Sequence, residues 1–149
     1  MIEIQVVNRS GREVDEAAAT ELARSVLSGE GVAAGDLGLA FVGPDESRAL
    51  KQEHLGVDEA TDALAFPIDG LAALPDGVPR QLGDVVVCPD VCALEASSAK
   101  PKRPGGKPRA PAAPALGNEW RRPLVHALLH LVGYDHGPEM EAREAVYAE

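Results

Sequence analysis

The chain has 149 residues and a formal net charge of −10; 45% of its residues are apolar and 3% are aromatic. This size and composition predict one globular domain with an aliphatic core. Because no apolar run is long enough to span a membrane and the first residues lack the basic start and apolar block of a signal peptide, we expect a cytoplasmic location. The acidic balance argues against a nucleic-acid-binding surface that covers the whole molecule.

Basic residues gather in one segment, 100–122, which holds seven of the 14 lysines and arginines and a single acid, Glu119. Its first part, 100–115, is rich in proline and glycine and has no apolar period, so we predict a flexible insert within one domain. This basic insert could bind a nucleic-acid backbone or could be a solvated insertion without a task. Its candidate contacts are Lys100, Lys102, Arg103, Lys107 and Arg109.

The first half of the chain predicts two strands and two helices from its apolar patterns. Asp15 is expected to cap the first helix, and Gly29 is expected to end it. The expected elements are strands at residues 2–7 and 37–42 and helices at residues 15–28 and 44–55.

The second half predicts two strands and three helices. Pro123 would remove a hydrogen bond inside a helix, so that helix is expected to begin at Pro123. The loop 69–81 is expected to be irregular because of its glycines and prolines. The expected elements are strands at 61–67 and 83–89 and helices from about 89 to 99, from 123 to about 132, and from 137 or 138 to the end.

The order of these elements predicts the architecture. Two consecutive strands joined by a long loop imply at least one antiparallel pairing. We therefore expect an α+β fold in which residues 1–149 form a single domain, with a mixed four-stranded sheet packed against about five helices.

Cys88 and Cys92 are the two cysteines of the chain. Their C-x3-C spacing matches neither a redox C-x-x-C motif nor a paired zinc knuckle. The simpler interpretation is two small buried apolar residues in a reducing compartment, and a metal or redox role is the alternative.

The stretch HALLHLVGYDH, residues 126–136, holds three histidines at the ligand spacing of zinc proteases of the form H-E-x-x-H-x-x-G-x-x-H. Its second residue is an alanine, where those proteases have the glutamate that acts as general base. A helix would place His126 and His130 on one face, one turn apart. Gly133 can adopt the left-handed conformation that ends a helix, which would let His136 fold back toward them.

Three convergent imidazoles predict a metal site. They leave a fourth tetrahedral position open for water, and they suit zinc best, with nickel, iron or copper possible. Each histidine alone could be a core residue, and a pair at this spacing could be a helix-surface pair. The surrounding helix is apolar nearly all round, however, so imidazoles there would cost free energy unless something binds them. Asp135, next to His136, could orient a ring or cap the turn.

Three motifs carry a family resemblance. HALLHLVGYDH, followed by Glu139-Met140, resembles the motif H-G-x-L-H-L-x-G-Y-D-H of the YbeY family of bacterial endoribonucleases, also called rRNA maturation factors. TDALAFP at 61–67 resembles the T-D-V-L-S-F-P strand of the family, and LGDVVVCPD at 82–90 resembles its L-G-D-I-V-I segment. The motifs occur in the order of the family, and the similarity extends over the chain except for 100–115.

The resemblance implies a zincin-like α+β domain with one zinc ion per chain, held by His126, His130 and His136. It also implies hydrolysis of single-stranded RNA, maturation of the 3′ end of 16S rRNA, and a role in ribosome assembly and quality control. The implied partners are single-stranded RNA, ribosomal RNA and the small ribosomal subunit.

The sequence departs from the family at two functional positions. Ala127 replaces the usual glycine of the histidine motif. Many members carry an arginine shortly before the T-D strand, thought to contact the phosphate; counted back from Thr61, that position is Leu55. His54, Lys51 or the basic insert could supply the missing cation.

The histidine motif and the family resemblance together predict a hydrolase. In it, zinc activates water or the scissile phosphate of RNA without an adjacent glutamate. Its expected catalytic residues are His126, Asp135 and His54, and Asp62 could also assist proton transfer. Two other interpretations stay open. A non-catalytic, zinc-stabilised ribosome-associated protein is favoured by the missing arginine, and a metalloprotease would lack its base. The sequence does not predict an oligomeric state.

Overall fold

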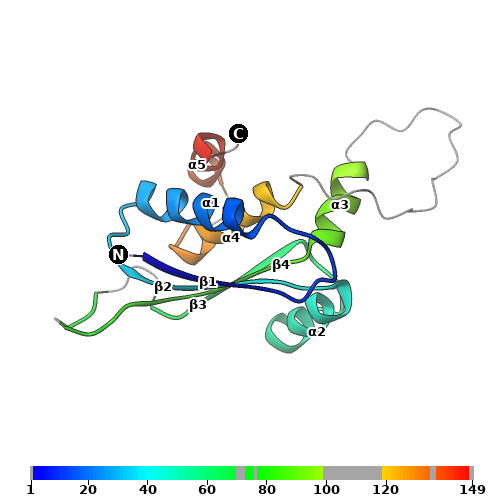
Figure 1. The fold of residues 1–149 in the computed structure, drawn as a ribbon, viewed down its shortest axis with the longest axis horizontal. Helices are drawn as coiled ribbons and strands as arrows, with labels where there is room; N and C mark the ends of the chain where they lie inside the picture. The colour runs from blue at the N-terminus through cyan, green and yellow to red at the C-terminus, as the bar shows by residue number, and fades with distance from the viewer. Residues whose placement is uncertain (1, 70–72, 76, 99–118, 135–136, 148–149) are drawn as a thin grey trace, which may run out of the picture.

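The computed structural model describes residues 2–69, 73–75, 77–98, 119–134 and 137–147. The basic insert, Asp135 and His136 therefore lie outside the described residues. Within them, the fold consists of a four-stranded mixed sheet and five helices (Figure 1). The α+β fold expected from the order of the elements is confirmed.

The sheet contains β1 (Ile2–Asn8), β2 (Gly35–Phe41), β3 (Ala63–Pro67) and β4 (Gln81–Val87), in the order β1-β2-β4-β3. β1 and β2 are parallel and are joined by the crossover helix α1. β2 and β4 are also parallel, although the chain passes through α2 and β3 between them. β3 pairs antiparallel with β4, which confirms the pairing expected for two consecutive strands. β3 is an edge strand, and β4 lies inside the sheet.

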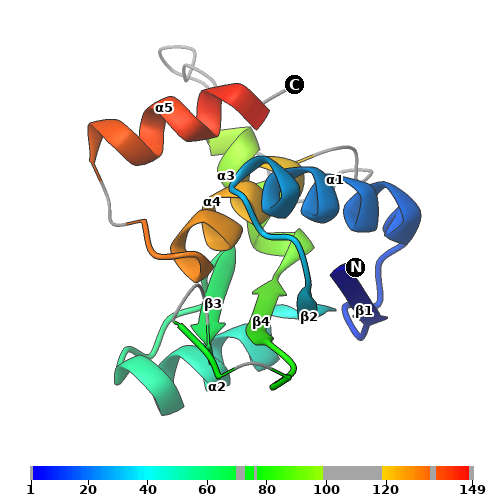
Figure 2. The ribbon, with the colours of Figure 1, turned by 90° about the vertical axis from the view of Figure 1, so that its left-hand side faces the viewer.

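The helices are α1 (Glu16–Gly29), α2 (Pro44–Leu55), α3 (Pro89–Ser98), α4 (Arg121–Leu131) and α5 (Pro138–Tyr147). α1 and α4 cover one face of the sheet, α5 lies against α4, and α2 covers the opposite face (Figures 1 and 2). Asp15 caps α1 as predicted, since its Oδ1 accepts a hydrogen bond of 3.0 Å from the Ala18 N–H. None of the described helices is long and apolar enough to cross a membrane.

The two faces of the sheet bury different amounts of apolar surface. Successive side chains of β4 point to opposite faces, so Val85 and Val87 join the core under α1 and α4, while Val86 faces α2. The α1 and α4 side is the larger core. The buried residues of the apolar cluster on the α2 side are Val42, Leu64, Val86 and Cys88.

The expectation that a helix begins at Pro123 is wrong, because α4 begins two residues earlier, at Arg121. Pro123 is the third residue of the helix, where a backbone N–H has no partner within the helix, so the proline removes no hydrogen bond. Trp120 precedes the helix and is buried, with its ring packed edge-on against Phe41 at 6.0 Å between centroids. This contact anchors the start of α4 on the sheet.

Both cysteines are buried, and neither belongs to a disulfide. Cys88 lies under α2, where burial raises the pKa of its thiol, and Cys92 lies in the larger core. Their interpretation as small buried apolar residues agrees with this environment.

Candidate metal centre

Helix α4 lies over β3 and β4 and contacts both α1 and α5. His126 and His130 are half-buried on this helix. Ala127 is 2% exposed, so the position that holds the base of a zinc protease points into the core here. The buried residues of α4 are Leu124, Val125, Ala127, Leu128, Leu129 and Leu131.

The two histidines face each other. Their Nε2 atoms are 3.1 Å apart, and their ring centroids are 4.7 Å apart with the planes nearly perpendicular, at 81°. The four-residue spacing in a helix places them one turn apart on one face, as predicted.

The turn after α4 holds the ring of His130. Gly133 has a φ of 108°, which few other residues adopt, and it ends the helix as expected. The Gly133 N–H donates to the His130 carbonyl and the Tyr134 N–H to the Leu129 carbonyl, both at 3.0 Å, which is the hydrogen-bond pattern of a Schellman motif. The chain then presents the Tyr134 carbonyl, which accepts a hydrogen bond of 2.9 Å from Nδ1 of His130.

Helix α5 holds the ring of His126. Glu144 of α5 contacts Nδ1 of His126 through Oε1, and the two side chains are 14% and 36% exposed. Glu144 lies 18 residues further along the chain and on another helix. Sequence reasoning missed it, because no local spacing connects Glu144 with the histidine motif.

These outer contacts determine what the inner nitrogens can bind. When both Nδ1 atoms donate, a neutral ring carries its lone pair on Nε2, so the two Nε2 atoms bring two lone pairs together. A shared proton or a cation between them stabilises this arrangement. Two nitrogens bound tetrahedrally to one zinc ion are separated by about 3.3 Å, close to the spacing here. The donor set and its outer carbonyl and carboxylate partners therefore fit zinc.

The third predicted ligand, His136, lies outside the described residues. Within the parts of the chain that the structure describes, no three His, Cys, Asp or Glu side chains gather closely enough to hold a metal ion. The described centre is thus a pair of histidines, and the third ligand stays a prediction.

The structure places His54 away from this pair. The His54 ring packs on Phe66 of β3 with 4.7 Å between the centroids, and Phe66 belongs to the cluster under α2. His54 thus lies on the opposite face of the sheet from α4. Its neighbour Leu55 is 60% exposed, and Lys51 of the same helix has Nζ 3.9 Å from a carboxylate oxygen of Glu59.

The other predicted polar residues are placed as follows. Asp62 precedes β3, and its Oδ1 accepts a hydrogen bond of 2.7 Å from the Ala63 N–H. Asp135 and the cations of the basic insert, Lys100, Lys102, Arg103, Lys107 and Arg109, lie outside the described residues.

A solved structure shares this fold. The solution structure of TM1509 from Thermotoga maritima aligns with a TM-score of 0.54 and 23% sequence identity, covering 99% of this chain and 86% of that one. At this identity the likeness concerns the arrangement of the elements alone.

Sequence comparisons identify the family. The chain is 34% identical to the endoribonuclease YbeY of Salinispora tropica over 150 residues, covering 95% of this chain and 87% of that protein. It is 40% identical to the endoribonuclease YbeY of Halorhodospira halophila over 115 residues, which cover 74% of this chain and 66% of the Halorhodospira protein. The sequence profile of the endoribonuclease YbeY family matches residues 4–148. The chain therefore belongs to the endoribonuclease YbeY family, whose members are hydrolases that act on RNA.

Proposed function

We propose that this chain is a zinc-dependent endoribonuclease specific for single-stranded RNA, which matures the 3′ end of 16S rRNA and serves ribosome quality control in the cytoplasm. The observation that carries the proposal is the His126–His130 pair, whose Nε2 atoms converge while each Nδ1 is held by an outer partner. Membership of an endoribonuclease family supports RNA as the substrate. Ribosomal RNA and the small ribosomal subunit are the proposed partners.

In this proposal, His126 and His130 hold the zinc ion through Nε2, and His136 is the third ligand. When bound, zinc supplies a Lewis acid that stabilises negative charge on the scissile phosphate and activates water for attack. Glu144 and the Tyr134 carbonyl keep each described ring in the tautomer that presents Nε2. Ala127 occupies the position of the general base of a zinc protease and not that of a ligand, so it leaves the proposed metal ligands in place.

Proton transfer and RNA contact are assigned to other residues. We propose that Asp135 assists proton transfer because it is the sequence neighbour of His136. His54 packs on β3 from the α2 side, and its proposed place in the reaction is where RNA passes around this edge of the sheet. The basic insert is proposed to contact the RNA backbone.

Cleavage of a defined RNA tests the proposal. Metal-free protein loaded with zinc should cut a single-stranded oligonucleotide and spare the matching duplex, and a chelator should stop cleavage until zinc is restored. His130→Ala should lower the rate by at least about 100-fold because it removes a metal ligand. Arg48→Gln is the control, since it breaks an ion pair between Arg48 of α2 and Asp58, which follows that helix; the two side chains are 57% and 53% exposed.

Other outcomes would replace the proposal. Cleavage that persists in chelator or in His130→Ala excludes the metal role. Binding to small ribosomal subunits without cleavage of any RNA would establish a non-catalytic protein, and digestion of casein would establish a protease.

His54→Ala tests the role of His54. If His54 only packs on Phe66, the cleavage rate should change little; if it transfers a proton, the rate should fall by about 10² or more.

Deletion of residues 100–115 tests the basic insert. Each lysine or arginine that contacts a phosphate adds to the salt dependence of binding, so the deletion should weaken RNA binding and flatten its dependence on salt. Fluorescence anisotropy with single-stranded RNA over a range of salt concentrations measures both. An unchanged salt slope would show that the insert does not contact the backbone.

A further inference from the structure

Glu30 stands at an unfavourable place for a carboxylate. It is the residue that follows α1, at the negative end of the helix dipole, and its side chain is 4% exposed. Burial of a charge adds a desolvation cost. A residue that breaks local rules in this way marks a site with another constraint than the stability of its own helix.

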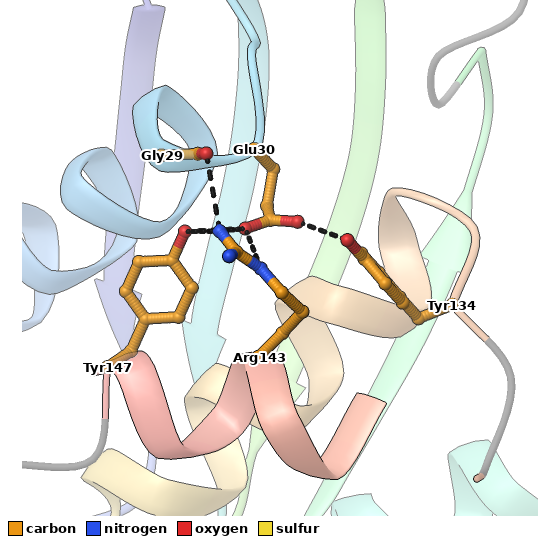
Figure 3. A network of polar contacts seen from close by, with 5 residues as sticks. All are labelled: Gly29, Glu30, Tyr134, Arg143 and Tyr147. Carbon is orange, nitrogen blue, oxygen red and sulfur yellow. Dashed lines mark hydrogen bonds and ion pairs between the residues drawn. The ribbon is translucent and has the colours of Figure 1, made fainter. Parts of the chain in front are cut away.

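Three side chains converge on this carboxylate (Figure 3). The Tyr134 hydroxyl donates to Oε1 at 2.6 Å, and the Tyr147 hydroxyl donates to Oε2 at 2.5 Å. Arg143 donates to Oε2 through Nε at 2.9 Å and also through Nη2. Burial alone raises the pKa of Glu30, but these hydrogen bonds and the charge of Arg143 outweigh it and hold the pKa below its ordinary value. Glu30 is therefore ionised at neutral pH.

Tyr134 connects Glu30 with His130. Tyr134 is the residue whose carbonyl accepts from Nδ1 of His130, and its hydroxyl is bound to Glu30. Its N–H donates to Leu129 within the turn. Tyr134 is thus fixed at the backbone by the turn and at the far end of its side chain by Glu30.

Helix α5 connects Glu30 with His126. Arg143 and Tyr147 tie α5 to Glu30 at the end of α1 (Figure 3). Glu144, the next residue after Arg143, contacts Nδ1 of His126. The position of Glu144 depends on where α5 lies. Glu30 holds α5 through Arg143 and Tyr147, which lie on either side of Glu144 in the sequence.

We infer that Glu30 is a positioning residue for the histidine pair: by fixing Tyr134 and α5, it sets the carbonyl that holds His130 and the carboxylate that holds His126. The inference rests on the proposed function insofar as the pair binds zinc. Glu30 acts through other residues and is not a catalytic residue.

Two matched substitutions test the route to His130. Tyr134→Phe and Tyr147→Phe each remove one hydroxyl that donates to the same carboxylate, but only Tyr134 has its carbonyl on His130. The first measurement is solvent exchange of the His130 Nδ1–H by NMR, in metal-free and zinc-loaded protein. The second is the zinc dissociation constant, by competition with a chromogenic chelator.

Tyr134→Phe should speed exchange of the His130 proton and weaken zinc binding by about 3- to 10-fold, which is less than loss of a direct outer partner because Tyr134 keeps its carbonyl. Tyr147→Phe should leave the His130 proton unchanged. Leu22→Ala in α1 removes buried apolar surface without removing a hydrogen bond of this network, and it controls for a general loss of stability. It should not change the exchange of either histidine proton.

Glu30→Gln provides a second test, because it keeps the volume of the side chain and removes its charge. It should speed exchange at His130 and also at the His126 Nδ1–H, since both routes begin at this carboxylate. Equal effects of the two tyrosine substitutions on the His130 proton, or an unchanged proton in both Tyr134→Phe and Glu30→Gln, would overturn the inference. The exchange measurement needs no metal, so a wild-type protein that binds no zinc would contradict the proposed function while the exchange rates still decide the role of Glu30.

Discussion

The two faces of the sheet hold their polar groups in different ways. On the α1 and α4 side, Glu30 is 4% exposed and is bound by three side chains from two other segments. On the α2 side, Glu46 pairs with Arg9, and their side chains are 38% and 52% exposed. α2 itself buries a single residue, Ser47. The histidine pair lies on the side where packing fixes the side chains, as a metal centre requires, because its ligands must be held within fractions of an ångström.

The largest effect on stability is expected from Gly83→Ala. Gly83 lies in β4 with a φ of 137°, and a Cβ there would come within 2.3 Å of the Phe66 carbonyl oxygen and 2.9 Å of Leu131 Cδ1. The backbone of β3 would have to move, and the Leu131 side chain would have to shift. We expect a loss of about 3 kcal/mol in the free energy of unfolding, measured by urea denaturation.

Gly43→Ala is the matched control, at the start of α2. A Cβ at Gly43 meets no atom within 4 Å, and its φ of −77° suits any residue. We expect a change below about 1 kcal/mol, from the weaker helix cap. Similar losses in the two variants would show that the close packing around Gly83 constrains the fold no more than the open start of α2 does.

Glu30→Gln should have the second largest effect. Loss of hydrogen bonds to a charged, buried group should cost about 2 kcal/mol at pH 7. The pKa of Glu30 is lowered in the folded protein, so the stability from its charge is present above the unfolded value of about 4.3 and is lost as the pH falls through the folded pKa. The difference between wild type and variant should therefore shrink between about pH 5 and pH 3. A difference that stays constant over this range would show that the charge of Glu30 is not what stabilises the network.

Glu46→Gln should have the smallest effect. Hydrogen bonding to Arg9 lowers the pKa of Glu46 as well, but the pair is exposed and screened by solvent and salt. We expect a change within about 0.5 kcal/mol, which 1 M salt removes. A loss as large as that of Glu30→Gln would contradict the contrast between the two faces.

The local parts of the site could be predicted from the sequence. The spacing of His126 and His130 fixes their common helix face, and Gly133 ends the helix in a left-handed conformation, because both features depend on a few consecutive residues. Glu144 and Glu30 could not be predicted in this way. Glu144 contacts His126 only after α5 has packed on α4. Glu30 contacts Tyr134 and Arg143, more than 100 residues away in sequence, only after the end of α1 has come beside them.

For the fold as well, local features could be predicted from the sequence, whereas features that depend on packing could not. The strand and helix periods predicted nine elements in the observed order, and consecutive β3 and β4 predicted the antiparallel pair. Pro123 predicts too late a start for α4, because proline disrupts the interior of a helix but is tolerated in its first turn. The face of the sheet on which His54 lies depends on the packing of α2 against Phe66, which no local pattern contains.

X-ray absorption spectroscopy at the zinc edge tests the central claim most directly. One equivalent of zinc is added to metal-free protein, and the spectrum is compared with that of His130→Ala. We predict a first shell of light donors at about 2.0–2.1 Å with the outer scattering of at least two imidazole rings, and the loss of one ring in the variant. A shell without imidazole scattering, or an unchanged spectrum in His130→Ala, would contradict the assignment of His126 and His130 as metal ligands.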